Sequence, residues 1–212
     1  MQTFSDFLQQ EGRALLVRLG IGRPGGSRII LIHVVLLAVF GVFLPWTKGL
    51  EFTDSTILSA YLCMSVVFAA PSAAEAFSVN APASMSEAFA RITVAVLYGE
   101  ILVLAMVLAG LATVTARAAF IPPDLATVGY AGLLGITASF ALAATAAWIT
   151  LRFSTNAARG ALRAIFLVLL LMFFYWSRWL PHYAPTGAVI CLFLGLAMLF
   201  SLRSLLRPQE IP

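Results

Sequence analysis

The chain has 212 residues, of which 61% are hydrophobic and only 10% are charged. A soluble domain carries about 25% charged residues, so this composition, with a mean hydropathy of +0.98, excludes a water-soluble globular fold. The net charge of +4 does not indicate nucleic-acid binding, because the basic residues lie at the ends of apolar runs rather than in one patch. The composition therefore predicts a single all-α, polytopic membrane domain over residues 1–212 that contacts the lipid bilayer and no nucleic acid.

Residues 4–19 predict an amphipathic helix that lies in the membrane interface. Its apolar side consists of Phe4, Phe7, Leu8, Leu15 and Leu19. Glu11 and Arg18 interrupt that side, so an ordinary helix packed against a partner element is an open alternative.

Six apolar segments follow, each about long enough to cross a hydrocarbon core of about 30 Å. They cover residues 29–46, 56–74, 100–116, 125–151, 164–180 and 186–202. The fourth segment is rich in Ala and Gly, which lets helices approach each other closely in lipid. We therefore expect the fourth segment to be central in a six-span bundle.

The basic residues are distributed unequally between the two ends of these segments. With the N-terminus in the cytoplasm, ten of the thirteen Lys and Arg residues fall on the inner side, and only Lys48, Arg117 and Arg178 fall on the outer side. The positive-inside rule therefore predicts that both termini are cytoplasmic and that the number of spans is even.

The loop after the second span carries the most informative pattern. Ser84 and Glu87 have the S-x-x-E spacing of a capping box, which predicts a helix that begins near Met85. Glu87 and Arg91 are four residues apart in the order that favours an ion pair on one helix face. Together these patterns predict a short cytoplasmic amphipathic helix over residues 85–97 that leads into the third span.

No pattern in the sequence predicts a catalytic residue, a metal site or a cofactor. The chain contains no phosphate-binding loop of the G-x-x-x-x-G-K-[ST] type, no Gly-x-Ser-x-Gly elbow and no paired metal-binding histidines. His33 fits a polar group near the inner end of the first span, and Cys63 and Cys191 fit small buried hydrophobic residues. We therefore do not expect this chain to be an enzyme or to hydrolyse ATP itself.

Glu100 is the acidic residue whose depth in the membrane matters most. If the third span begins at Arg91, Glu100 lies about nine residues inside it and predicts a proton or ion site near the middle of the membrane. If residues 85–97 form a surface helix, Glu100 lies only at the interface. Residues 101–117 alone come close to one span, which favours the interfacial interpretation.

Four segments follow one another in a distinctive order: an amphipathic N-terminal helix, an inner loop with a short helix, an apolar-Gly-charged element and a second inner loop. They are residues 4–19, 75–91, 96–100 and 152–159. In this order, and with six spans, they resemble the membrane subunits of ABC-2 type transporters. The haem-exporter B subunit of cytochrome c maturation is similar in size and in its number of spans.

The resemblance implies a permease of a bacterial cytoplasmic (inner) membrane that works with a separate ATP-binding subunit and forms a homo- or heterodimer of permease subunits. The helix at residues 85–92 would sit in a groove of the ATPase and transmit its movement to the spans. The residues implied in this coupling contact are Glu75, Ser84, Glu87, Phe89 and Arg91.

Two departures from the family pattern leave other functions open. Residues 78–82 replace the acidic-basic-acidic box that is common in the family, and Glu100 replaces its usual Lys. A non-transporting structural subunit of a larger respiratory or photosynthetic membrane complex is the main alternative. An intramembrane enzyme or an ion-coupled carrier built around Glu100 is the third, and no pattern in the spans identifies a substrate.

Overall fold

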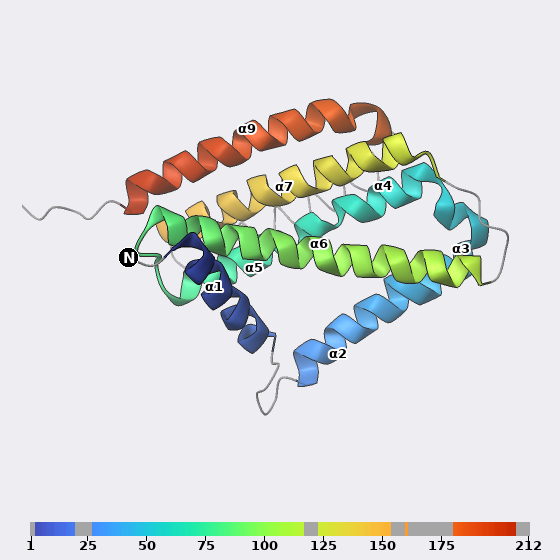
Figure 1. Cartoon of the computed structure of the whole chain (residues 1–212), viewed down its shortest axis with the longest axis horizontal. Coiled ribbons are helices and arrows are strands. Elements are labelled where there is room, and N and C mark those ends of the chain that lie inside the picture. The colour runs from blue at the N-terminus through green and yellow to red at the C-terminus, as the bar shows by residue number, and fades with distance from the viewer. Residues whose placement is uncertain (1–2, 20–26, 117–122, 154–159, 161–179, 207–212) are drawn as a thin grey trace, which may run out of the picture.

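The computed structural model describes residues 3–19, 27–116, 123–153, 160 and 180–206, and all the regular elements in these ranges are helical (Figure 1). The elements are α1 (Phe4–Arg18), α2 (Ser27–Leu36), the π-helical segment η1 (Leu37–Phe43), α3 (Leu44–Lys48), the 3-10 segment η2 (Gly49–Thr53), α4 (Ser55–Cys63), α5 (Ser65–Val79), α6 (Met85–Thr115), α7 (Leu125–Arg152) and α9 (Leu180–Leu206). The expected all-α fold is confirmed.

Five of the described helical segments are long and apolar enough to cross a membrane, as an integral membrane protein requires. They are Leu31–Thr53, Ser55–Val79, Met85–Thr115, Leu125–Arg152 and His182–Leu206. The span expected at residues 164–180 lies almost wholly outside the described residues, so the count of six stays a prediction. The consecutive described helices α7 and α9 run in the same direction, as a span between them would require (Figure 1).

No break separates the helix expected at residues 85–97 from the span expected at residues 100–116, into which it was expected to lead. Helix α6 begins at Met85, where the Ser84 hydroxyl accepts a hydrogen bond from the Glu87 amide at 3.2 Å, and it continues for 31 residues without a break. The expected start of the helix is confirmed, but neither a cap nor a proline follows Leu97 to end it. At about 46 Å, the helix is longer than the hydrocarbon core.

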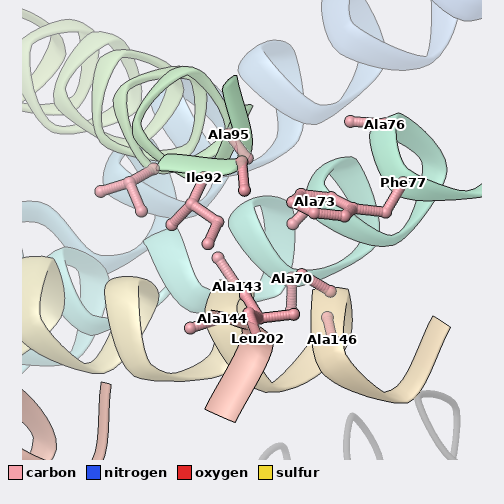
Figure 2. Packing of buried hydrophobic residues seen from close by; sticks show 13 residues of the cluster. Ala70, Ala73, Ala76, Phe77, Ile92, Ala95, Ala143, Ala144, Ala146 and Leu202 are labelled. Atoms are coloured by element: carbon pink, nitrogen blue, oxygen red, sulfur yellow. The ribbon is translucent and has the colours of Figure 1, made fainter. Parts of the chain in front are cut away.

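Helix α7 is the most buried of the five spans and packs against both α5 and α9, which confirms its expected central position. Small side chains from α5 and α7 meet in the cluster of buried residues that Figure 2 shows. Its alanines are Ala70, Ala73, Ala76, Ala88, Ala95, Ala143, Ala144, Ala146 and Ala147. Since apolar side chains gain little by leaving lipid, this close backbone approach is a main source of attraction between the helices.

The first span is irregular where it passes through the π-helical segment η1. Two carbonyl groups in this segment accept hydrogen bonds from side chains of neighbouring helices. The Tyr61 hydroxyl donates to the carbonyl of Phe40 at 3.1 Å, and the Thr113 hydroxyl donates to that of Gly41 at 3.5 Å. Such partners are what an irregular backbone needs in a membrane, because lipid offers no hydrogen bonds.

The second span is interrupted at Met64, between α4 and α5. The Met64 amide bonds to the carbonyl of Tyr61, three residues back, at 2.9 Å. A glycine on each neighbouring helix allows this break to be packed tightly.

The two glycines are Gly99 on α6 and Gly135 on α7. A Cβ atom at Gly99 would lie 2.6 Å from the carbonyl oxygen of Ser65, and a Cβ atom at Gly135 would lie 2.5 Å from that of Leu62. Both distances are far below van der Waals contact and involve backbone atoms, so the α4–α5 break is held between two helices that must lack a side chain at these points.

We expect Gly99→Ala to lower the thermal unfolding temperature in detergent, because the added methyl group must push the α5 backbone away, at a cost of about 1–3 kcal/mol. Gly132→Ala is the matched control, since its Cβ atom would meet only Leu62 Cδ1 at an ordinary 3.7 Å. Equal loss of stability in the two variants would contradict the close-approach explanation.

Candidate functional site

Arg91 is buried at the end of the bundle where α6 begins. Its guanidinium donates hydrogen bonds to the carbonyl of Ala76 at 2.8 Å, to the carbonyl of Asn80 and to the carboxylate of Glu87. The guanidinium carbon also lies 5.7 Å from the centre of the Phe77 ring. Arg91 therefore closes the end of α5 onto the first turns of α6, and the expected pairing of Glu87 with Arg91 is confirmed.

The same arginine binds the N-terminal helix. Arg91 Nε lies 3.2 Å from Oε1 of Glu11, at ion-pair distance but without hydrogen-bond geometry, and Arg18 lies 3.1 Å from Oε2 of Glu11. Glu11 is 8% exposed and Arg91 is 7% exposed. With Glu87, these residues form a network of two acids and two arginines whose formal charges cancel; we call it the Arg91 network.

The Arg91 network explains the two charges that interrupt the apolar side of the N-terminal helix. Glu11 pairs with Arg91 of α6 and Arg18 pairs with Glu11, so α1 packs against another element of the same chain, and its location in the membrane interface stays a prediction. An apolar contact adds to the ionic one: the Phe4 ring stacks on Phe89 with centroids 5.5 Å apart, and Phe89 meets the ring of Phe140 edge-on.

At its start, α1 is closed by a cap that also fixes a carboxylate. The amide of Thr3 donates to the Asp6 carboxylate at 2.7 Å. Hydrogen bonds from this amide and from the Thr3 side chain hold the pKa of the exposed Asp6 carboxyl below its ordinary value. The helix begins at Phe4 because this reciprocal cap satisfies its first free amide.

The structure brings Ser84, Glu87 and Arg91 together, and it places Phe89 beside them against α1. Glu75 is exposed on α5 and takes no part in the Arg91 network. The sequence interpretation missed Glu11 and Arg18 as members of this site. Their place on the apolar side of an amphipathic helix was the signal that could have identified them.

The surface open to a partner at this end is the connection between α5 and α6 rather than the helix face at residues 85–92. Within residues 85–92, Ala88, Ala90, Arg91 and Ile92 are buried within the chain, whereas Ser86 and Phe89 are exposed. In the segment of residues 78–86, which we call the α5–α6 tip, the exposed residues are Ser78, Val79, Asn80, Ala81, Ala83 and Ser86. The tip contains no charged residue, and its Val79 is 66% exposed. It therefore presents a small, uncharged surface.

A second polar cluster lies inside the bundle, where Glu100 on α6 approaches Ser65 on α5 and Ser139 on α7. Ser139 and Ser65 are fully buried, and their hydroxyls are hydrogen-bonded to each other at 2.9 Å. Oε1 of Glu100 is buried and has no hydrogen-bond partner. Glu100 is the sixteenth of the 31 residues of α6 and therefore lies at the middle of this helix.

His33 connects the first span to α6. Its Nε2 atom is hydrogen-bonded to the hydroxyl of Tyr98, two residues before Glu100, and the two rings lie 5.8 Å apart. Across the described ranges, no three His, Cys, Asp or Glu side chains gather in a way that could hold a metal ion. His33 therefore serves as a contact between helices.

No family model, no curated protein and no solved structure matches this chain. Its fold and sites define a polytopic, all-α integral membrane protein with an ionic network at one end and a polar cluster in its interior.

We expect Arg91→Gln to free α1 from the bundle, because the buried carboxylates of Glu11 and Glu87 lose their counter-charge. Removing one partner of a buried ion pair costs about 3–5 kcal/mol. Limited proteolysis should then cut after α1 faster than in the parent protein, while the exposed Arg13→Gln control should be unchanged.

A double-mutant cycle checks the cause. Glu11→Gln combined with Arg91→Gln should destabilise the protein by less than the sum of the single changes, since the charge left unpaired by one change is removed by the other. Strict additivity would show that Glu11 and Arg91 do not stabilise each other.

Proposed function

We propose that the chain is the membrane-spanning permease subunit of an ABC-2 type ATP-driven exporter and is coupled to a separate ATPase subunit. The observation that carries this proposal is the Arg91 network, which joins α1, the end of α5 and the beginning of α6 at one end of the bundle. A permease driven by another subunit needs such a unit, because an external displacement must reach the spans without being absorbed by a soft loop.

The contacts of Arg91 suggest how the displacement would travel. Its hydrogen bonds to Ala76 and Asn80 couple α5 to α6, so the α5–α6 tip cannot move without both helices. Helix α6 then continues for 31 residues into the bundle without a kink or break. Movement of the ATPase at the tip would thus reorient two spans together.

The proposal places the tip in the cytoplasm of a bacterial cell, on the inner side of its cytoplasmic membrane. Helix α1 and the ends of α7 and α9 lie at the same end of the bundle as the tip (Figure 1). Arg18, Arg91, Arg152 and Arg203 belong to this end, whereas Lys48 lies in α3 at the other. By the positive-inside rule, the arginine-rich end faces the cytoplasm.

The structure suggests a different contact for the ATPase than the sequence did. Since half of residues 85–92 are buried within the chain, the ATPase would receive the α5–α6 tip, which includes the 66% exposed Val79. Glu87 and Arg91 would support the tip from below instead of touching the ATPase. A second permease subunit, identical or homologous, would complete the transport pathway.

We expect a chain with Val79→Cys, in a background with Cys63→Ala and Cys191→Ala, to cross-link in native membranes to a protein that carries a phosphate-binding loop. ATP with vanadate should change the yield, because nucleotide binding moves the ATPase. Leu50→Cys is the matched control: Leu50 is also an exposed apolar residue but lies in η2, at the opposite end of the bundle.

Equal cross-linking from both positions would contradict docking at the tip. If redox or pigment proteins are captured and no ATPase is, the chain is instead a non-transporting subunit of a larger membrane complex.

A further inference from the structure

The polar cluster of Glu100, Ser65 and Ser139 lies at the same depth in three different spans. Glu100 is residue 16 of 31 in α6, and Ser139 is residue 15 of 28 in α7. Ser65 is residue 11 of 25 in the span Ser55–Val79. Three mid-span positions that meet in space place the cluster near the middle of the membrane, where an ionisable side chain is costly and marks a functional site by default.

No cationic side chain faces Glu100 from the described helices around it. Helices α4 and α5 contain no Lys, Arg or His, and α7 contains only Arg152 at its far end. Arg91 on α6 itself is nine residues away, about 13 Å along the helix.

Of the titratable groups around Glu100 in the described residues, His33 of α2 is the one that can carry a positive charge, and its Nε2 atom is hydrogen-bonded to the hydroxyl of Tyr98. The thiol of Cys63 at the end of α4 interacts electrostatically with Glu100 and with Cys191 of α9. Tyr98 lies on α6 itself, next to Glu75 of α5. Among the described residues around it, an ionised Glu100 would thus have no permanent counter-charge, and a proton is the simplest means of neutralising it.

The two serines form a relay that depends on the state of Glu100. The Ser139 hydroxyl donates to Ser65 Oγ at 2.9 Å, and the Ser65 hydroxyl donates to the carbonyl of Leu62 at 3.1 Å. Both serine hydroxyls thus already donate their protons, and only the lone pairs of their oxygens remain to accept a hydrogen bond from Glu100. A neutral carboxyl group can donate to such a lone pair, whereas a carboxylate needs the hydroxyls to turn toward it.

The tight packing around the cluster selects the ligand. Ser65 and Ser139 are fully buried, and the Gly99 and Gly135 positions leave no space for even one methyl group beside the α4–α5 break. A metal cation would need several oxygen ligands in a shell with a radius above 2 Å. A proton requires no such shell.

We propose that Glu100 is a reversible proton-binding site whose occupancy is transmitted by Ser139 and Ser65 to the helix break at Met64. On binding, a proton from the aqueous phase forms an O–H bond on the carboxylate, and this group donates to Ser139 Oγ. Ser139 then donates to Ser65, and Ser65 to the Leu62 carbonyl, which closes the end of α4.

Loss of the proton to water reverses the relay. The hydroxyls turn to the carboxylate, and the carbonyl of Leu62 at the break loses its partner. The site thus couples a protonation change to the geometry of a broken span, and it does so whether or not an ATPase binds at the tip.

The test is infrared difference spectroscopy of the full chain in lipid vesicles, between about pH 4 and about pH 10, a range that covers ordinary and strongly shifted carboxyl groups. We expect the stretching band of a protonated carboxyl group to appear and disappear with pH. Glu100→Gln should abolish the titrating band, while Glu75→Gln, which changes an exposed glutamate of a neighbouring span, should leave it.

The rate of amide hydrogen exchange across residues 62–68, corrected for the intrinsic effect of pH, reports how far the backbone opens at the α4–α5 break. We expect exchange to rise with loss of the band in the parent protein and to be pH-independent in Glu100→Gln. Ser139→Ala should keep the titrating band but lose the link to exchange. This variant also tests the relay if Glu100→Gln does not fold.

A band that is constant or absent over the whole pH range would overturn the proposal, and so would a band that changes when sodium replaces potassium. Cross-linking of Val79→Cys to the ATPase in the Glu100→Gln background separates the two hypotheses. Retained cross-linking with loss of the band supports both, whereas absence of cross-linking from Val79→Cys in a chain whose Glu100 is intact and titrates contradicts the exporter alone.

Discussion

The guanidinium of Arg91 is the group on which the arrangement of the arginine-rich end of the bundle depends. A buried arginine is tolerated only if its charge is paired and its N–H groups are bonded. Here the partners come from α5, from α1 and from the first turn of α6. One side chain therefore fixes the α5–α6 connection and docks the N-terminal helix, which no apolar contact of the same size could orient.

Inside the bundle, the constraint changes from charge to volume and backbone hydrogen bonding. The spans pack through alanines and glycines, so their backbones come close enough for irregular segments to be supported by neighbouring helices. The π-helical segment and the break at Met64 both occur where Tyr61, Thr113 or Ser65 supplies a hydrogen bond to a carbonyl. Irregular backbone in these spans thus coincides with side chains that satisfy it.

Local patterns in the sequence predicted the structural features that depend on residues close together in the chain. The start of α6 and the pairing of Glu87 with Arg91 follow from spacings of three and four residues. The contact of Glu11 with Arg91 and that of Ser65 with Ser139 join residues more than 70 positions apart, and no local spacing encodes them. The depth of Glu100 stayed open between two interpretations because an apolar run shows that a helix exists but not where it starts to leave the lipid.

Helix α5 connects the two polar sites. Arg91 holds its C-terminal end through the carbonyls of Ala76 and Asn80, and the Glu100 cluster meets its N-terminal end at Ser65. Since α6 supplies both contacts, the 15 residues of α5 form a strut attached to one unbroken helix at each end. A displacement of the α5–α6 tip would therefore be relieved at the interruption of the second span, beside Glu100. Mechanical coupling at the tip and protonation in the membrane would then act on the same hinge, and each could bias the other without direct contact between their residues.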